Sequence, residues 1–365
     1  MWDGERYGDV VTGIKAGLLF MGTIIGAGFA SGKEILTFFA GNIVSLVFSV
    51  ISAGIFFYLT GLLFFNLGKR IQADNLFKIT EVLLKKYSYI FNIFLAFCYL
   101  VLLAAMLAGV DALAKESIGY NGFFPIFSII VLILAILITR KGINGMIKIN
   151  SILVPIVIVF IFAVCIFSLS KITYLNSGNW SEKGMTFFSS ILNCILYVAM
   201  NMFLSSAVLV TAGKNMNSRQ VKISSFTAAI LITILLTLIL LTFRLNYSKI
   251  QGMEMPMVVL ALDVSPIFSI ISVIILLCAI FTTLISSLYP LKEYLEPFIV
   301  KEKTLYISLG VIGFLLSRIG FTYIIVYIYP FMGLIGVMFI AFCAVYDVQK
   351  TKPKFVVRKK IKNYD

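Results

Sequence analysis

The sequence contains no histidine and few charged residues. Aspartate, glutamate, lysine and arginine make up 13% of the 365 residues, whereas 61% are apolar. The lack of histidine excludes a proton relay built from histidine side chains. The shortage of charge excludes a soluble fold, because too few polar side chains remain to cover its surface, and the mean hydropathy is +1.04. Lipid is therefore the predicted solvent of the chain.

The features that mark enzymes are also missing. No motif for metal catalysis, phosphate binding or an activated nucleophile stands out, so we expect neither an enzyme nor a cofactor. The cysteines show no metal-ligand spacing and are interpreted as core residues: Cys98, Cys165, Cys194, Cys278 and Cys343. Because no linker or soluble segment interrupts the chain, residues 1–365 are predicted to form one transmembrane domain.

Apolar runs recur along the whole chain. A helix needs about 20 apolar residues to cross the hydrocarbon core of a bilayer. Five candidate spans lie in the first half, at 14–40, 43–68, 88–113, 123–139 and 146–170. Five more lie in the second half, at 185–212, 222–243, 266–291, 304–318 and 320–346. The predicted fold is an all-α integral membrane protein with ten transmembrane helices.

Basic residues outnumber acidic ones, 30 to 16. A net charge of +14 can indicate a nucleic-acid partner. Here, however, the lysines and arginines are spread over alternate short loops and a basic tail at 349–365, where anionic lipid headgroups attract them. By the positive-inside rule, both termini are predicted to be cytoplasmic in a bacterial cytoplasmic (inner) membrane, with no nucleic acid bound.

The two halves of the chain share landmarks. The first span is irregular near Gly26 and the sixth carries Asn201 at a corresponding position, while Tyr99 in the third span corresponds to Ala279 in the eighth. These offsets predict two repeats, at about 10–172 and 184–348. Because five is an odd number, the second repeat must cross the membrane in the opposite sense. Such inverted repeats are typical of secondary transporters.

The segment from Gly22 to Glu34, GTIIGAGFASGKE, lies in the middle of the first span. Each of its four glycines weakens a helix by roughly 1 kcal/mol relative to alanine. Ser31 and Glu34 have the spacing of a capping box, which predicts a second half-helix starting near Gly32. Unwound backbone at this depth must line a polar cavity. Close helix packing through the glycines is the alternative interpretation.

Free amides at a helix start attract anions, and free carbonyls at a helix end attract cations. The backbone of Gly26, Ala27 and Gly28 is therefore a predicted cradle for a carboxylate, beside a site for a small cation. Lys33 and Glu34 are costly in lipid and are candidates for a gate, unless Glu34 serves only as a cap.

Three further groups are candidates for the same cavity. Five hydroxyl-bearing residues follow Ala279 in the eighth span and suit a monovalent cation, although threonine and serine also bond back to their own helix. In the sixth span, Met200 and Asn201 are candidate substrate contacts at a second helix break, and Asn201 can instead join helices. Tyr99 can face the cavity or anchor its helix.

The segment GTIIGAGFASGKE, followed by nine further spans, resembles the YkvI-like family of bacterial membrane proteins. That family is similar to the amino acid-polyamine-organocation (APC) superfamily, which has the LeuT-type fold of five plus five inverted helices, with helices 1 and 6 broken. In sodium-coupled relatives a G-x-x-x-G-x-G pattern supplies two carbonyls to sodium, which points to Gly22 and Ile25. An A-x-x-T-[ST] motif completes that site, and Ala279, Thr282 and Thr283 match it.

The resemblance implies a symporter of a small amino acid or related zwitterion, driven by one sodium ion and working by alternating access. Phe29 stands where one branch of these transporters has an asparagine for a second sodium, so only one ion is expected. Proton-coupled or exchange transport and a non-transporting sensor with the same fold are the alternatives. Uptake without sodium, or the absence of any stabilising amino acid, would distinguish them.

Overall fold

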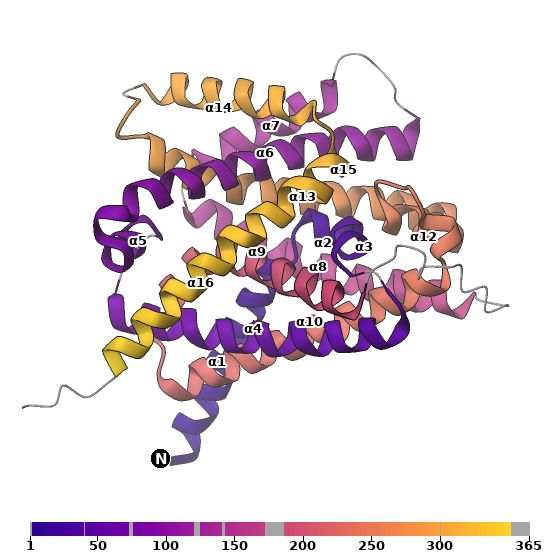
Figure 1. Cartoon of the computed structure of the whole chain (residues 1–365). Helices are drawn as coiled ribbons and strands as arrows, with labels where there is room; N and C mark the ends of the chain where they lie inside the picture. Colours follow the sequence, from indigo (N-terminus) through magenta and orange to yellow (C-terminus); the bar gives the residue numbers. More distant parts are fainter. Residues whose placement is uncertain are drawn as a thin grey trace, which may run out of the picture.

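The computed structural model describes residues 2–39, 41–72, 76–119, 125–140, 143–171, 186–299 and 301–351, and these residues are almost entirely helical. Most of the predicted polar loop at 171–184 and of the basic tail at 349–365 lies outside the described residues. Helices occur at all ten predicted spans (Figure 1). The described part of the chain therefore confirms the all-α class.

The first half of the chain contains the interrupted first span and the helices of the next four predicted spans. The first span comprises α1 (Trp2–Ile24), α2 (Ala27–Ser31) and α3 (Lys33–Phe38). The others are α4 (Ile43–Ile71), α6 (Ser88–Ile118), α7 (Ile126–Thr139) and α8 (Ile143–Ser170), with α5 (Leu76–Leu84) and the short 3₁₀ helix η1 (Lys85–Tyr87) between α4 and α6.

The helices in the second half of the chain are more continuous. It contains α9 (Phe187–Gly213), α10 (Ser218–Leu245), α13 (Pro266–Leu295) and α14 (Glu302–Ser317), with the short α11 (Tyr247–Ile250) and α12 (Pro256–Val264) after α10. The last span begins with α15 (Phe321–Tyr323), passes through a π-helical segment, η3 (Ile324–Ile328), and continues as α16 (Tyr329–Thr351).

Local sequence explains where several helices begin. The Asn42 side chain accepts a hydrogen bond from the amide of Ser45 at 2.8 Å and so caps α4. Asn217 and Gln220 form a complete capping box at the start of α10. Proline follows the cap of α13, where its missing N–H costs nothing.

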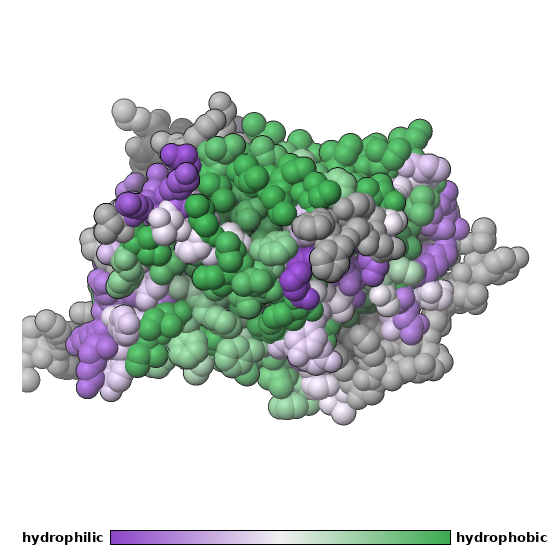
Figure 2. Space-filling view, turned by 90° about the horizontal axis from the view of Figure 1, so that it is seen from above, coloured by the Kyte–Doolittle hydropathy of each residue, from purple (hydrophilic) through white to green (hydrophobic). Residues whose placement is uncertain are grey.

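Figure 2 shows an apolar band across one face of the molecule, with most of the hydrophilic residues of that face toward its left and right ends. Aliphatic side chains such as Ile51, Val159 and Ile274 are exposed. Seven helical segments among the described residues are long and apolar enough to cross a membrane, and α7 is a shorter apolar helix. The chain is therefore a multi-pass membrane protein, while the count of ten spans remains a prediction.

Several long helices pack against one another. The most extensive contacts join α4 to α9, α9 to α16, α1 to α10, α6 to α13 and α4 to α10. If the first five spans are exchanged for the second five, α1 with α10 becomes α9 with α4, whereas α9 with α16 becomes α1 with α8, a much smaller contact. The inverted repeat therefore stays a prediction, and the contacts place α9 and α10 beside α1 and α13 beside α2.

Two glycines let α4 and α9 approach closely. A Cβ atom on Gly68 would lie 2.0 Å from the carbonyl oxygen of Val210, and one on Gly213 would lie 2.3 Å from the carbonyl oxygen of Phe65. Neither backbone can move away without disturbing its own helix. Small residues at helix crossings are the usual basis of packing between helices in a bilayer.

We therefore predict that Gly68→Ala and Gly213→Ala each lower the free energy of unfolding by about 1–3 kcal/mol, because overpacking forces the backbones apart. Thermal unfolding in detergent measures the effect. Gly8→Ala is the matched control, since a Cβ there would meet nothing within 4 Å. Equal midpoints for all three variants would show that the crossing is not tightly packed.

Candidate functional site

The first span is interrupted where the sequence predicts it. Helix α1 ends at Ile24, and Gly26 has an extended backbone (φ −98°, ψ −170°) before α2 begins at Ala27. The amide of Gly26 bonds to the carbonyl of Ile24 at 2.9 Å, so the interruption is compact. Helices α2 and α3 lie within the body of the molecule (Figure 1), and Ala27 and Gly28 are buried.

The predicted restart near Gly32 is wrong in detail. The helix resumes at Ala27 and is interrupted again at Gly32, which has φ +80° and no side-chain cap. A Cβ on Gly32 would also lie 2.2 Å from the ring of Phe243. Ser31 and Glu34 do not form a capping box, because the Ser31 hydroxyl accepts from the amide of Lys33 at 3.3 Å and the Glu34 carboxyl lies beside Gly28. Only Gly tolerates this left-handed turn and close approach together.

The interruption meets α13 directly. The amide of Ala27 donates a hydrogen bond to the Thr283 Oγ1 atom at 3.2 Å. A Cβ on Gly26 would lie 3.0 Å from the same oxygen. The amide that α2 leaves unpaired at its start is thus satisfied by a side chain from another helix. The structure brings together two segments that lie more than 250 residues apart in the sequence.

The candidate sodium ligands lie on both sides of this contact. The hydroxyls of Thr282 and Thr283 each donate to the carbonyl of Ala279 at 2.9 Å, so both bond back to their own helix. Ile25 is buried at the interruption, and Gly22 faces α8, where its Cβ would meet Val154 at 3.1 Å. A hydroxyl that donates its hydrogen keeps lone pairs for a cation, whereas the Ala279 carbonyl already accepts both hydroxyls.

Glu34 folds back onto α2. A Cβ on Gly28 would lie 1.8 Å from the Glu34 Oε1 atom, so the carboxyl occupies the space that any larger residue at 28 would need. Glu34 is 7% exposed. The sequence spacing of Gly28 and Glu34 does not predict this contact. The contact depends on the left-handed turn at Gly32, which directs the Glu34 side chain back toward α2. It places a carboxyl beside the predicted carboxylate cradle.

Lys33 contacts a neighbouring loop. Its ammonium group donates to the carbonyl of Met253 at 2.7 Å. The same short loop is held from α6, where the Glu116 carboxylate accepts from the amides of Glu254 and Met255 at 2.6 and 2.9 Å. Lys33 and Glu116 therefore fasten the loop before α12, and the role of Lys33 and Glu34 as a gate stays a prediction.

The second predicted break is wrong as well. Helix α9 runs from Phe187 to Gly213 without interruption. It has no glycine or proline before Gly213, and the Asn201 amide group donates to the carbonyl of Tyr197 at 2.9 Å within the same helix. Met200 is buried where α16 crosses, since a Cβ on Gly336 would lie 3.2 Å from its amide.

The remaining candidates do meet near the interruption. The Tyr99 hydroxyl donates to the carbonyl of Leu204 at 3.3 Å, which joins α6 to α9. The Ser205 hydroxyl donates to the carbonyl of Thr23 at 3.3 Å, just before α1 ends. Ser205 was missed in the sequence, although it lies one turn after Asn201 on the same face of α9. Helices α1, α6 and α9 are thus tied together at one level.

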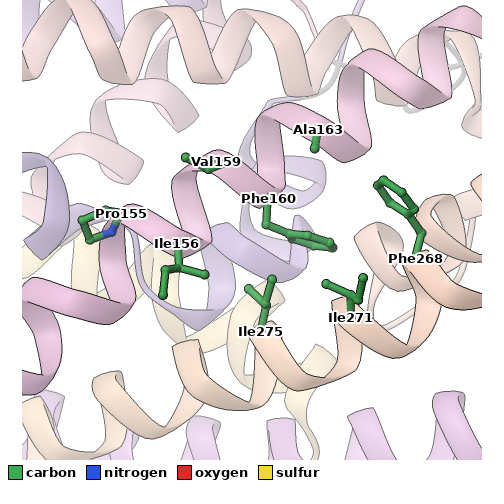
Figure 3. Close-up of a pocket in the computed structure, with 8 residues that line it drawn as sticks. All are labelled: Pro155, Ile156, Val159, Phe160, Ala163, Phe268, Ile271 and Ile275. Atoms are coloured by element: carbon green, nitrogen blue, oxygen red, sulfur yellow. The ribbon is translucent and has the colours of Figure 1, made fainter.

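An open apolar cavity of about 420 Å³ lies elsewhere, between α8 and α13. Figure 3 shows the Phe160, Phe268, Ile271 and Ile275 side chains converging on it. Its lining offers almost no polar atom, and Ile271 is partly exposed on the apolar surface. The cavity cannot orient a zwitterion and is not the site that the interruption forms.

Comparison with known proteins places this geometry in a family context. No protein-family model matches the chain. The chain is 28% identical to the uncharacterized membrane protein YkvI of Bacillus subtilis (strain 168) over 329 residues, which are 88% of this chain and 92% of YkvI. The expected resemblance to YkvI-like membrane proteins is confirmed.

Solved structures agree on the fold. MhsT in complex with L-phenylalanine is similar with a TM-score of 0.59 and 17% identity, over 90% of this chain and 88% of MhsT. Mhp1, a nucleobase-cation-symport-1 family transporter solved in a closed conformation with bromovinylhydantoin bound, is similar with a TM-score of 0.57 and 16% identity, over 83% of this chain and 70% of Mhp1. The chain therefore has the LeuT-type fold.

The contact between Gly28 and Glu34 predicts a strong coupling between their mutations. Gly28→Ala should destabilise the protein in thermal unfolding, because its Cβ collides with the carboxyl, and should cost much less when Glu34→Ala is also present. We expect a coupling free energy of about 0.5–3 kcal/mol, the range for residues in contact.

Gly26→Ala combined with Glu34→Ala is the matched control, since the Cβ at 26 faces Thr283 and not Glu34. That pair should be additive. Additivity of the Gly28 and Glu34 substitutions would mean that the two groups are not in contact.

Proposed function

We propose that this YkvI-like membrane protein with the LeuT-type fold is a secondary active transporter. It takes up a small amino acid or related zwitterion, coupled to one sodium ion, by alternating access. Both termini are cytoplasmic, and the chain crosses the bacterial cytoplasmic membrane ten times. The observation that carries the proposal is the contact between the interrupted first span and the threonines of α13.

The fold supports transport because its interruption creates backbone polar groups inside an apolar belt. Such groups are tolerated only where they are buried in protein or line a cavity. MhsT, with a similar fold, was solved with an amino acid, and Mhp1 belongs to a cation-symport family by its description. These relatives support a small-molecule substrate for this chain.

Sodium coupling is supported by the kind of oxygen atoms that the proposed ligands offer. The proposed ligands are all uncharged carbonyl and hydroxyl oxygens, on Gly22, Ile25, Ala279, Thr282 and Thr283. Hard cations take oxygen ligands, and a set without carboxylates suits a single positive charge better than a double one. Because one ligand group lies on each side of the Ala27–Thr283 contact, a bound ion would hold α1 and α13 together.

The substrate would lie beside the ion. In this proposal the backbone of Gly26, Ala27 and Gly28 lies next to the substrate, although the amide of Gly26 already bonds to the carbonyl of Ile24. Asn201 lies on α9, which bonds to the end of α1, and Tyr99 bonds to α9 from α6. Asn201 and Met200 act in this proposal from a continuous helix and not from a second break. Helix α2 has five residues, and its first amide is already bonded to Thr283, so a carboxylate would depend on the following amides.

We predict that the double variant Thr282→Ala and Thr283→Ala raises the sodium concentration for half-maximal amino acid uptake about tenfold or more, which corresponds to about 1.4 kcal/mol. Uptake into proteoliposomes under a sodium gradient measures the effect, once a thermal-shift screen of the amino acids with and without sodium has identified the substrate.

Ser287→Ala is the matched control for that variant. Its hydroxyl is buried on the same helix and donates to the carbonyl of Leu284 at 2.9 Å, away from the interruption. Uptake that persists undiminished when choline replaces sodium would reject sodium coupling. A protein that no amino acid stabilises would support the alternative of a sensor.

A further inference from the structure

The open cavity between α8 and α13 has no part in the proposed transport site. We call it the α8–α13 groove: residues between 155 and 163 of α8 form one wall, and residues between 268 and 275 of α13 form the other (Figure 3). Its volume is about 420 Å³. Ligand pockets commonly measure roughly 300–1,000 Å³. The groove is therefore large enough to hold a bound molecule.

The groove opens onto an apolar surface. Val159 on one wall is 68% exposed, and Ile271 on the other wall is 41% exposed. At 1.5 Å per residue, Pro155 and Ala163 lie about 23 and 11 Å along α8 from its end at Ser170. For a helix that crosses a bilayer, both positions fall within the hydrocarbon core, which is about 30 Å thick. Acyl chains therefore surround the opening of the groove.

The chemistry of the lining excludes polar occupants. The lining side chains are aliphatic or aromatic and offer almost no polar atom. A buried water needs about two to four polar partners, so an apolar cavity stays dry. A zwitterion or a lipid headgroup would leave its charges uncompensated in this groove. A hydrocarbon chain has no polar group to satisfy and meets neither cost.

A transmembrane helix from a second copy of the chain fits the groove poorly. Helices pack closely in a bilayer where glycine, alanine, serine or threonine lets their backbones approach. Among the described lining residues only Ala163 belongs to that group. A flexible chain can instead follow the irregular space between Phe160 and Ile275, whose side chains converge from the two walls (Figure 3). An empty groove would forfeit the van der Waals contacts of its walls.

Aromatic side chains close one end of the groove. The ring of Phe268 lies 5.2 Å from the ring of Phe167 between centroids, in an edge-to-face arrangement that joins α13 to α8 one turn beyond Ala163. Further along, the Lys171 ammonium group donates to the carbonyl of Asp263 at 3.0 Å and ties the end of α8 to α12. An occupant must therefore enter the groove from its exposed, lipid-facing side.

We propose that the α8–α13 groove is a binding site for one acyl chain of a bilayer phospholipid, and that this lipid stays bound when the surrounding bilayer is removed. The chain supplies the contacts that the two walls do not make with each other. The inference goes beyond the proposed function and does not depend on the proposed substrate or ion.

The position of the groove gives the bound chain a structural role. Val154 directly precedes Pro155 of the groove, and a Cβ on Gly22 would meet the Val154 Cγ1 atom at 3.1 Å. On the other wall, Ile275 lies one turn before Ala279, in the part of α13 that meets the interrupted first span. A chain in the groove therefore packs behind both helices at the level where they contact that span.

Native mass spectrometry of the full-length protein, purified in detergent without added lipid, tests the proposal. The wild type should retain one phospholipid. Ala163→Phe should lower the fraction of protein that carries this lipid about tenfold, because the new ring fills the groove and a chain beside it would be overpacked. Ala341→Phe is the matched control, since it makes the same substitution at an exposed position of α16. It should retain lipid as the wild type does.

A photoreactive phospholipid provides a second readout that does not depend on a variant folding. The wild type is placed in nanodiscs that contain a phospholipid with a diazirine in the middle of one acyl chain, and the labelled residues are mapped after irradiation. Labels should be several-fold more abundant on the two walls of the groove than on Ile51 and Ile55 of α4. Those side chains are 52% and 54% exposed, so they report ordinary contact with bulk lipid.

Several results would overturn the proposal. A wild type that retains no phospholipid, or an Ala163→Phe variant that retains as much as the wild type, would contradict a bound chain. Labelling of the groove no stronger than that of α4 would show only bulk lipid. A dimer that Ala163→Phe dissociates would assign the groove to a second copy. Because neither measurement uses substrate or sodium, absence of uptake would reject the proposed function and leave the lipid site standing.

Discussion

The need to satisfy every backbone polar group within an apolar belt governs this structure. A continuous helix pairs its own backbone amides and carbonyls. The first span is interrupted between Ile24 and Ala27, so its backbone groups there must find hydrogen-bond partners on other helices. Thr283 accepts from the amide of Ala27, and Ser205 donates to the carbonyl of Thr23. The interruption is therefore hydrogen-bonded to both α9 and α13.

Much of this arrangement could be predicted from the sequence because the relevant signals are strong and local. Long apolar runs require helices, and Gly26 with Gly28 weakens one of them at a definite place. The match of Ala279, Thr282 and Thr283 to a known motif identified the helix that meets the interruption.

The failures came from interactions that sequence spacing does not encode. Ser31 and Glu34 have capping-box spacing, but the left-handed turn at Gly32 separates them and sends the carboxyl to Gly28. Asn201 was expected at a helix break, yet a side-chain amide can bond to its own helix and leave it intact. In both cases tertiary geometry decided which of two possible hydrogen bonds a polar side chain makes.

The loop before α12 is held by hydrogen bonds to its main chain. Lys33 binds the carbonyl of Met253, and Glu116 binds the amides of Glu254 and Met255. These contacts do not depend on which side chains the loop carries. The side chain at 253, which is 38% exposed, is thus free to change during evolution while the fastening is preserved. Among homologues, substitutions should therefore be frequent at Met253, Glu254 and Met255 and rare at Lys33 and Glu116.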